Sequence, residues 1–313
     1  MTATTTQAAR PRRRPDTPVW EEPPTPAGSA AKGVVLVAVV AVILVPLYTI
    51  VLTSFSTQAA INEAGGLVTV PRGLTLEAYR QIFTNQLITH SLLVSLVVTA
   101  VGTAVSMVVT VLCAYGLSRS GSFAHRTLLM FLVVTMFFSG GLIPSFLVVA
   151  ALGGYGQYWT LILPGAVSVF NILVMRGFFS STAPELIDAA RMDGAGEWRI
   201  LWSVVLPTSR AVTAVITLFY AVGYWNSFFN ALLYLPDNQQ WPLQMIIYTY
   251  TLQGGNMPGT GTTGTGQYAG HQEIAHLSLQ MAVVTLTLIP ILIVYPFVQR
   301  HFTKGMLIGA IKG

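Results

Sequence analysis

The sequence predicts an all-α integral membrane protein with six transmembrane helices. Only 9% of its residues are charged, against about 25% in soluble domains, and its mean hydropathy is +0.64. Six stretches are apolar and long enough to cross a bilayer, which takes about 20 residues for about 30 Å of hydrocarbon. These observations exclude an ordinary soluble enzyme and a disordered chain. The single cysteine, Cys113, excludes an internal disulfide framework.

Each predicted span is free of Asp, Glu, Lys and Arg. In order, the spans occupy residues 33–53, 87–115, 127–152, 158–175, 211–235 and 277–298. The third is interrupted by Gly140, Gly141 and Pro144, which predict a kink or unwound backbone lining a cavity. The first is longer than the apolar core of a cleaved secretory signal, which has about 7–15 residues, so we expect it to be retained.

The spans are expected to form one membrane domain, residues 33–298. Its two long connections are a cytoplasmic one at 176–210 and an external one at 236–276. The domain is flanked by tails at 1–32 and 299–313. The N-terminal tail is rich in proline, so we expect it to be disordered.

The positively charged residues assign the two sides of the membrane. Of the 16 Lys and Arg residues, only Arg72 and Arg80 fall in connections on the side opposite to the N-terminal tail. Lys and Arg are retained in the cytoplasm, so both termini are predicted to be cytoplasmic. An even number of spans agrees with this orientation.

The lack of charge within the spans limits the possible functions. Charged groups inside a bilayer are costly and usually serve function, for example as proton relays or ion sites. A carrier driven by protons or sodium usually needs a buried carboxylate, and the predicted spans hold none. The sequence therefore predicts either a transporter driven by another protein or a passive channel. A membrane-embedded enzyme or a structural membrane protein is a third alternative, with only hydroxyl and amide groups available in the spans.

The charged segment 176–210 predicts two short helices joined at an angle. Thr182 caps the first helix and Glu185 closes a capping box. Gly194 ends this helix because glycine readily adopts the left-handed conformation. The second helix is expected at 197–205, ended by the Leu-Pro pair that follows. Such a helix pair docks in a groove of another protein or lies on lipid headgroups.

One motif in this segment carries a family resemblance. The sequence DAARMDGA at 188–195, followed by Leu206 and Pro207, resembles the EAA loop of binding-protein-dependent ABC importer permeases. Its DGA form is similar to the carbohydrate-importer branch. The family usually has Glu where this chain has Asp188, which keeps the charge with a shorter reach. The segment 137–144 (FFSGGLIP) resembles a segment of the permeases for complex and oligomeric sugars, and 304–313 (KGMLIGAIKG) resembles the tail of the maltose-type second permease subunit.

The resemblance implies a permease subunit with the fold of a type I ABC importer, in a bacterial cell membrane. The implied substrate is an oligosaccharide or related neutral carbohydrate. Implied partners are a second homologous permease subunit, two ATP-binding subunits, an extracytoplasmic solute-binding protein and membrane lipid, but no nucleic acid. ATP and magnesium would be held by the partner ATPase, so no enzyme activity, cofactor or metal site is expected on this chain.

The resemblance also implies two sets of residues that contact the ATPase. The first set, in the EAA-like loop, consists of Glu185, Asp188, Ala189, Ala190, Asp193, Gly194 and Ala195. The second set, in the C-terminal tail, consists of Gly309, Ala310 and Lys312.

The fifth span carries a polar stripe. Its hydroxyl groups recur at intervals of four and three residues, which places them on one helix face: Thr213, Thr217, Tyr220, Tyr224 and Ser227. Hydroxyls, amides and aromatic faces suit a neutral sugar, so the candidates for the substrate pathway are Asn171, Tyr220, Tyr224, Trp225, Asn226 and Asn230. Hydrogen bonding between neighbouring helices is the alternative.

Two further patterns are interpreted as ordinary surface. Residues 259–264 match G-x-G-x-x-G, but they lack the strand and helix of a nucleotide site and predict a flexible external loop. His271, Glu273 and His276 do not share the helical face that a metal site needs.

Overall fold

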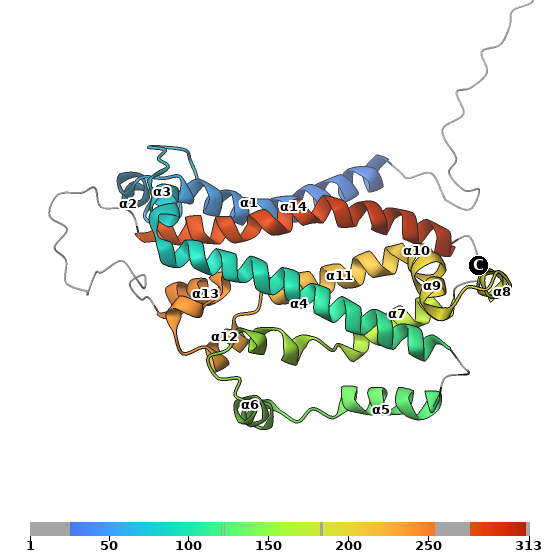
Figure 1. Cartoon of the computed structure of the whole chain (residues 1–313). Helices are drawn as coiled ribbons and strands as arrows, with labels where there is room; N and C mark the ends of the chain where they lie inside the picture. Colours follow the sequence, from blue (N-terminus) through green and yellow to red (C-terminus); the bar gives the residue numbers. More distant parts are fainter. Residues whose placement is uncertain (1–25, 120, 122, 182–183, 254–275, 311–313) are drawn as a thin grey trace, which may run out of the picture. The chain divides into compact units, whose positions relative to one another are not determined.

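A computed structural model describes residues 26–119, 121, 123–181, 184–253 and 276–310. Within these residues every regular element is helical, and an isolated antiparallel bridge joins Ser56 and Leu74 (Figure 1). The chain divides into two compact units, Met1–Tyr48 and Thr49–Gly313. Each unit is described by itself.

The first unit contains most of α1 (Pro26–Ser54). This helix has 29 residues, which corresponds to a length of about 44 Å, enough to cross a bilayer. Apolar residues lie all round the helix between Val34 and Val45, as expected for a span in contact with lipid.

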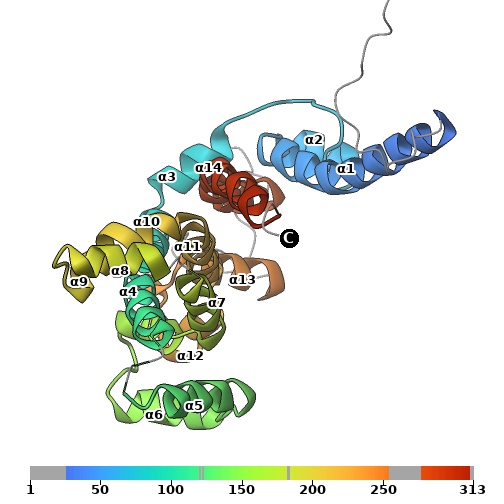
Figure 2. The same ribbon diagram turned by 90° about the vertical axis from the view of Figure 1, so that its right-hand side faces the viewer.

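The second unit is organised around α4 (Gln86–Ser118). Helix α4 packs along α11 (Arg210–Trp225) and α7 (Val169–Ser180), and α14 (His276–Ala310) packs along α11 (Figures 1 and 2). Helix α13 (Leu243–Gln253) contacts both α4 and α14. The apolar core of this unit therefore lies between α4, α7, α11 and α13.

Buried hydroxyl groups on α4 hold its neighbours. Ser106 Oγ lies 2.8 Å from the Tyr224 hydroxyl, and Thr110 Oγ1 lies 2.7 Å from the Tyr220 hydroxyl of the same helix, α11. Nearer the start of α4, Ser95 Oγ accepts a hydrogen bond from the Leu243 amide at 2.8 Å. Hydrogen bonds of this kind join helices where water is absent, so they set the register of α4 against α11 and α13.

Two short helices precede α4 along the chain. Helix α2 (Gln58–Ala64) begins at Thr57, whose side chain accepts the Ala60 amide, and ends at Gly65. Helix α3 (Glu77–Thr84) carries Tyr79, whose hydroxyl lies 2.8 Å from Ser54 Oγ. Ser278 of α14 donates to the Ser54 carbonyl at 3.3 Å. The end of α1 is thereby tied to α3 and α14.

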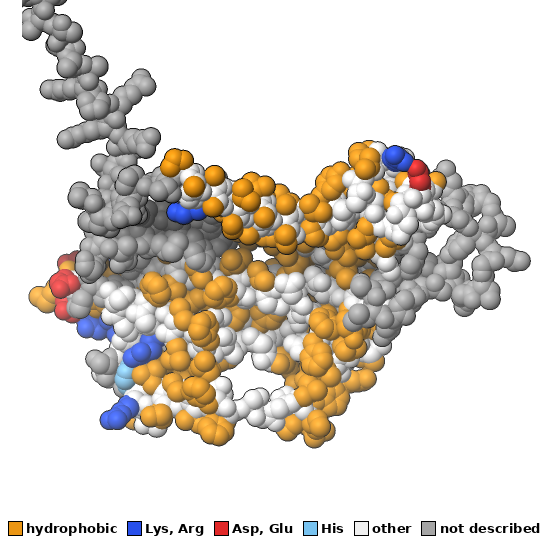
Figure 3. All heavy atoms as spheres, turned by 180° about the vertical axis from the view of Figure 1, so that it is seen from behind, with side chains coloured by type: hydrophobic (Ala, Val, Ile, Leu, Met, Phe, Trp, Pro, Cys, Tyr) orange, Lys and Arg blue, Asp and Glu red, His pale blue; other side chains and the backbone are white. Residues whose placement is uncertain are grey.

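The six predicted spans differ in continuity. Three helical segments are long and apolar enough to cross a membrane, namely Pro26–Ser54, Gln86–Ser118 and Leu277–Pro296. Three bent helix pairs would raise the number to as many as six. Exposed apolar side chains such as Leu93, Val97 and Val101 fit a surface facing lipid. Figure 3 shows apolar side chains over much of one face, with Lys and Arg near its edges.

The predicted third span bends sharply at its glycines. Helix α5 (His125–Phe137) and helix α6 (Leu142–Ala151) meet at an angle of 114°. Gly141 between them has a φ of 82°, which residues with a side chain rarely adopt. The predicted interruption of this span is confirmed at Gly140 and Gly141, but Pro144 lies inside α6, and the bend is far larger than a helix kink.

The predicted fourth span begins with two turns of 3₁₀ helix. These are η1 (Tyr158–Leu161) and η2 (Leu163–Gly165), and they meet α7 at a 50° bend. Pro164 falls in the first turn of η2, where its missing amide hydrogen costs no hydrogen bond. Ser168 then caps α7 by accepting the Asn171 amide.

The predicted fifth span, 211–235, is not one continuous helix. Helix α11 ends at Trp225, and a separate helix, α12 (Phe229–Tyr234), follows. The Asn226 side-chain amide donates to the Val222 carbonyl at 2.9 Å, so the side chain satisfies a carbonyl at the helix end. The 16 residues of α11 span about 24 Å, which is short for a full crossing.

The predicted external connection, 236–276, is partly helical. It contains η4 (Asn238–Gln240) and α13, whose Leu243 and Ile246 are completely buried. These residues of α13 therefore belong to the core. The motif at 259–264, together with His271 and Glu273, lies outside the described residues.

Replacing Gly102 with alanine should weaken the packing of α4 on α11. A Cβ atom there would lie 2.9 Å from three atoms of the Tyr224 ring, so the ring must move. We expect the free energy of unfolding to fall by about 1–3 kcal/mol, measured by thermal unfolding of the purified transporter in detergent. Gly116→Ala is the matched control, because a Cβ on this second glycine of α4 meets nothing within 4 Å. Equal unfolding temperatures for the two variants would contradict the close contact.

Candidate functional site: a bent helical elbow

A bent helical segment joins α7 to α11, and we call residues 184–209 the elbow. It consists of α8 (Pro184–Met192), a turn, α9 (Glu197–Ile200), the π-helical η3 (Leu201–Val205) and α10 (Leu206–Thr208). The segment from α9 to α10 then meets α11 at an angle of 87°. The predicted capping residue Thr182 lies outside the described residues.

The turn between α8 and α9 has the predicted left-handed glycine. Gly194 has a φ of 78°. Its amide donates to the Arg191 carbonyl, and the Ala195 amide donates to the Ala190 carbonyl, both at 2.9 Å. These bonds satisfy carbonyls at the end of α8. The predicted break at Asp193–Gly194 is thus confirmed.

The second helix of the elbow is longer than predicted. The sequence predicts its end at Leu206 and Pro207, but it continues to Thr208 and turns at Ser209. Pro207 has no amide hydrogen and cannot continue an ordinary α-helical ladder. The wider π turn of η3 comes directly before it, a local change of helix type that accommodates irregular residues.

The inner face of the elbow is apolar and buried. Its residues join the core that α4, α7 and α11 share, and they are Ile187, Ile200, Leu201 and Val205. The two alanines Ala190 and Ala195 are partly buried against the same cluster. The elbow is therefore packed into the second unit rather than being a loose loop.

The outer face of the elbow exposes both charge and apolar surface. Of the residues that the family resemblance assigns to the ATPase, Glu185, Asp188, Ala189 and Asp193 are exposed. Met192 is 89% exposed, and Trp198 and Trp202 are each 67% exposed. Exposed apolar side chains grouped on one segment indicate a surface that a partner or lipid covers.

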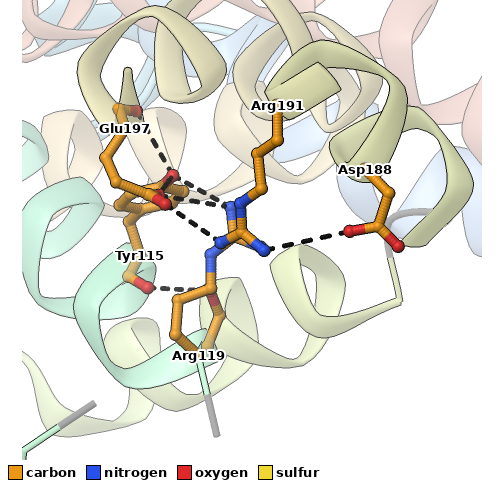
Figure 4. Close-up of polar contacts among 6 residues, drawn as sticks. Tyr115, Arg119, Asp188, Arg191 and Glu197 are labelled. Atoms are coloured by element: carbon orange, nitrogen blue, oxygen red, sulfur yellow. Dashed lines mark hydrogen bonds and ion pairs between the residues drawn. The ribbon is translucent and has the colours of Figure 1, made fainter. Parts of the chain in front are cut away.

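Glu197 is the centre of a charge cluster between the elbow and α4 (Figure 4). Its carboxylate accepts hydrogen bonds from the Tyr115 hydroxyl and, at 3.0 Å, from Arg191 Nη2. Arg119 Nη2 lies 3.7 Å from the same carboxylate and donates to the Tyr115 hydroxyl at 2.9 Å. The Arg119 guanidinium also lies 4.9 Å from the centre of the Tyr115 ring.

The same cluster affects the ionisation and pairing of the acidic residues of the elbow. The Tyr115 hydroxyl, together with the two arginines, holds the pKa of Glu197 below its usual value, so this carboxylate stays ionised at neutral pH. Arg191 also lies 3.8 Å from Asp188. The predicted ATPase-contacting Asp188 is therefore paired within the elbow, with a side chain that is still 72% exposed.

Tyr115, Arg119 and Glu197 were not predicted as site residues. Tyr115 and Glu197 are far apart in the sequence, and Arg119 served only to assign a side of the membrane. A second link of this kind joins α7 to α4, because Arg176 Nε donates to the Leu117 carbonyl at 2.8 Å. The only signal in the sequence is that Arg119 and Arg176 lie just after predicted spans, at ends that are predicted to be cytoplasmic.

The aromatic residues of the polar stripe make contacts within the chain. The Tyr220 hydroxyl, paired with Thr110, also accepts the Ser168 amide at 3.3 Å. The Tyr224 hydroxyl donates to the Ile162 carbonyl at 3.0 Å, and Trp225 Nε1 donates to the Thr287 carbonyl at 3.1 Å. All three aromatic side chains are buried, and their bonds are those of helix packing.

The other candidates of the pathway set lie elsewhere. Thr213 and Thr217 donate to carbonyls of their own helix. Asn171 is buried near the start of α7, Asn226 is exposed at the end of α11, and Asn230 is partly buried in α12.

The C-terminal candidates are at the edge of what the structure describes. Gly309 and Ala310 are the last residues of α14, and Lys312 lies outside the described residues. Among the described residues, no group of three His, Cys, Asp or Glu side chains could hold a metal ion.

Comparison with known proteins then shows the family of the chain. Residues 93–308 match the family of binding-protein-dependent transport system inner membrane components. The chain belongs to this family. It is thus a multi-pass permease subunit of an ABC importer rather than an enzyme, and the importer depends on a solute-binding protein.

Relatives of this permease include permeases of other sugar transport systems. The polygalacturonan/rhamnogalacturonan transport system permease protein YtcP of Bacillus subtilis is 41% identical, over 86% of this chain and 93% of its own length. The maltodextrin transport system permease protein MalD of Streptococcus pneumoniae is 25% identical, over 86% of this chain and 91% of its own.

A solved structure supports the fold of the permease. It is a bacterial ABC transporter involved in the import of the acidic polysaccharide alginate, and one of its chains superposes with a TM-score of 0.80. The two chains are 28% identical, and the match covers 88% of this chain and 96% of the other. The permease therefore has the type I ABC importer fold.

The contacts of Tyr224 generate a test of its role. In Tyr224→Phe the ring remains, but Ser106 Oγ and the Ile162 carbonyl lose their partner. We expect the free energy of unfolding to fall by about 1–3 kcal/mol, measured by thermal unfolding, with uptake falling only as far as assembly falls. Tyr155→Phe, at a 55% exposed tyrosine, is the control and should change little. Reduced uptake at an unchanged unfolding temperature would indicate contact with substrate instead.

Proposed function

We propose that this permease couples an ATPase to the import of an oligosaccharide, and that the elbow is the surface that the ATPase binds. The observation that carries the proposal is the exposed outer face of α8, ended by the left-handed turn at Gly194, in a chain of this family. The ATPase-binding residues are Glu185, Asp188, Ala189, Ala190, Asp193, Gly194 and Ala195. The tail residues Gly309, Ala310 and Lys312 form a second contact with the ATPase.

The complete transporter contains four further subunits in this proposal. A second homologous permease subunit shares the pathway, two ATP-binding subunits bind the elbows, and an extracytoplasmic protein delivers the sugar. With six spans and both termini in the cytoplasm, the elbow lies on the side of the ATPase. The positive charges support this orientation, since only Arg72 and Arg80 would lie outside.

Transport would follow from movement of the elbow. ATP binding closes the two ATPases and draws the elbows together, and α11 moves with them because it continues directly from α10. The spans then open the pathway toward the binding protein, and hydrolysis resets them. This is alternating access between two states that ATP and sugar stabilise differently.

The proposed substrate class comes from the relatives. YtcP and MalD are named for the transport of polymers built from sugars, and the alginate transporter is involved in the import of another. Within this class we propose a neutral oligosaccharide, because the predicted spans hold no Lys or Arg to pair with a uronate carboxylate. Asn226, exposed at the end of α11, is the pathway candidate that the contacts favour over the buried Tyr220, Tyr224 and Trp225.

Gly194→Val should uncouple ATP hydrolysis from uptake. Valine is strained at a φ of 78°, so α8 would leave the orientation in which the ATPase binds it. We expect uptake by proteoliposomes containing the complete transporter to fall at least about tenfold, while the permease still inserts. Gly196→Ala is the control, because Gly196 has a φ of −71° and open space around it. Normal binding-protein-stimulated uptake by Gly194→Val would contradict the assigned role of the elbow.

Competition between sugars tests the substrate and the energy source together. In proteoliposomes with the binding protein, uptake of a labelled neutral oligosaccharide should require ATP and should be reduced by unlabelled neutral oligosaccharides. Uronate oligosaccharides should compete weakly. Strong competition by uronates would make the substrate acidic, and uptake without ATP would identify a passive channel.

A further inference from the structure

We propose that Glu197 is a positioning residue that fastens the elbow to the cytoplasmic end of α4, so that α4 moves together with α11 when the ATPase moves the elbow. This inference rests on the proposed coupling role of the elbow and names a residue outside the EAA-like motif. Glu197 would determine whether movement of the elbow reaches α4 as well as α11.

Besides its packed apolar face and its chain link to α7, the elbow has two connections that decide how movement is divided between α11 and α4. One is the chain itself, which passes from α10 through Ser209 into α11 with an 87° bend. A bend of this size acts as a joint, since only Ser209 separates the two helices. The other connection is the Glu197 cluster, which crosses from α9 to α4.

The cluster makes contacts both within the elbow and at the end of α4. On the elbow side, Arg191 holds Glu197 at 3.0 Å and so joins α8 to α9 across the Gly194 turn. On the α4 side, Tyr115 lies in the last turn of the helix and Arg119 directly follows its end, and both reach the same carboxylate. Figure 4 shows these side chains converging on Glu197 from the two sides.

The position of α4 makes this link relevant to transport. Helix α4 is bonded to α11 at Ser106 and Thr110, in the stretch that precedes Tyr115. It also contacts α7 along its length and receives the Arg176 bond at its end. A displacement of the end of α4 would therefore reach the packed centre of the unit, whereas a displacement of α11 alone would strain the bonds between α4 and α11.

The cluster is suited to holding a position rather than to stabilising the fold. The Glu197 and Arg191 side chains are 54% and 48% exposed, and the Arg119 side chain is 23% exposed. Ion pairs this exposed contribute little to folding stability. The apolar inner face of the elbow keeps it folded without Glu197, so loss of the carboxylate charge should leave the elbow formed but less firmly attached to α4.

The test uses the complete transporter in proteoliposomes, with Glu197→Gln as the variant. Glutamine keeps the size of the side chain and can still accept from Tyr115, but it removes the charge that holds both arginines. We expect the amount of sugar imported per ATP hydrolysed to fall about five- to tenfold. Binding of the ATPase and its stimulated hydrolysis should stay within about twofold of the unsubstituted complex. Glu63→Gln, which breaks an exposed ion pair with Arg72 far from the elbow, should leave the ratio unchanged.

A double substitution checks that the effect comes from the link to α4. Arg119→Gln should lower the same ratio, and adding Glu197→Gln to it should cause little further loss, because both remove one interaction. Additive losses, or an unchanged ratio in Glu197→Gln, would overturn the positioning role. Loss of ATPase binding in Glu197→Gln would also overturn it, since Glu197 would then belong to the docking surface.

Failure of the proposed function gives a different result. If the elbow did not bind the ATPase, Gly194→Val would import sugar normally, whatever Glu197→Gln does. If Gly194→Val is uncoupled and Glu197→Gln is not, the elbow is the coupling surface but α11 alone carries the movement.

Discussion

The hydrogen bonds between α4 and α11 are the constraint on which the rest of the second unit depends. A bilayer supplies no water to a buried hydroxyl, so a hydrogen bond to a neighbouring helix is one of the few ways to satisfy it and also fixes how the two helices pack. Ser106 and Thr110 find theirs in Tyr224 and Tyr220. The absence of a side chain at Gly102 lets the Tyr224 ring lie against α4. The face of α4 that carries Gly102, Ser106 and Thr110 thus sets the register between α4 and α11.

This register reaches the end of the bundle at which the elbow lies. Beyond Thr110, the last turn of the same helix carries Tyr115, Arg119 follows the end of the helix, and both meet Glu197 of the elbow. The elbow is buried on the side that faces the helices and exposed on the other. In the proposed coupling, force on the outer face of this segment would reach both α11 and α4.

The chemistry of the spans agrees with the family. A permease driven by a separate ATPase needs no ion-coupling carboxylate of its own, and the predicted spans contain none. The charges of this chain gather instead where helices end, at the elbow and in the tails. A relative involved in the import of an acidic polysaccharide shares this fold, so the fold alone does not fix the charge of the sugar.

The sequence by itself determined the features that depend on local composition. The helical class and the long apolar helices α1, α4 and α14 follow from hydropathy, and the turn at Gly194 follows from the freedom of glycine. The DAARMDGA motif was also sufficient to indicate the family to which the chain belongs.

Only the tertiary structure decided the features that depend on which helices become neighbours. A stripe of hydroxyls has the same pattern whether it faces a sugar or another helix, and it is the position of α4 that pairs Tyr220 and Tyr224 with Thr110 and Ser106. The 114° bend between α5 and α6 exceeds what its glycines alone specify. Glu197 and Tyr115 are far apart in the sequence, so nothing local to either residue could reveal that packing brings them together.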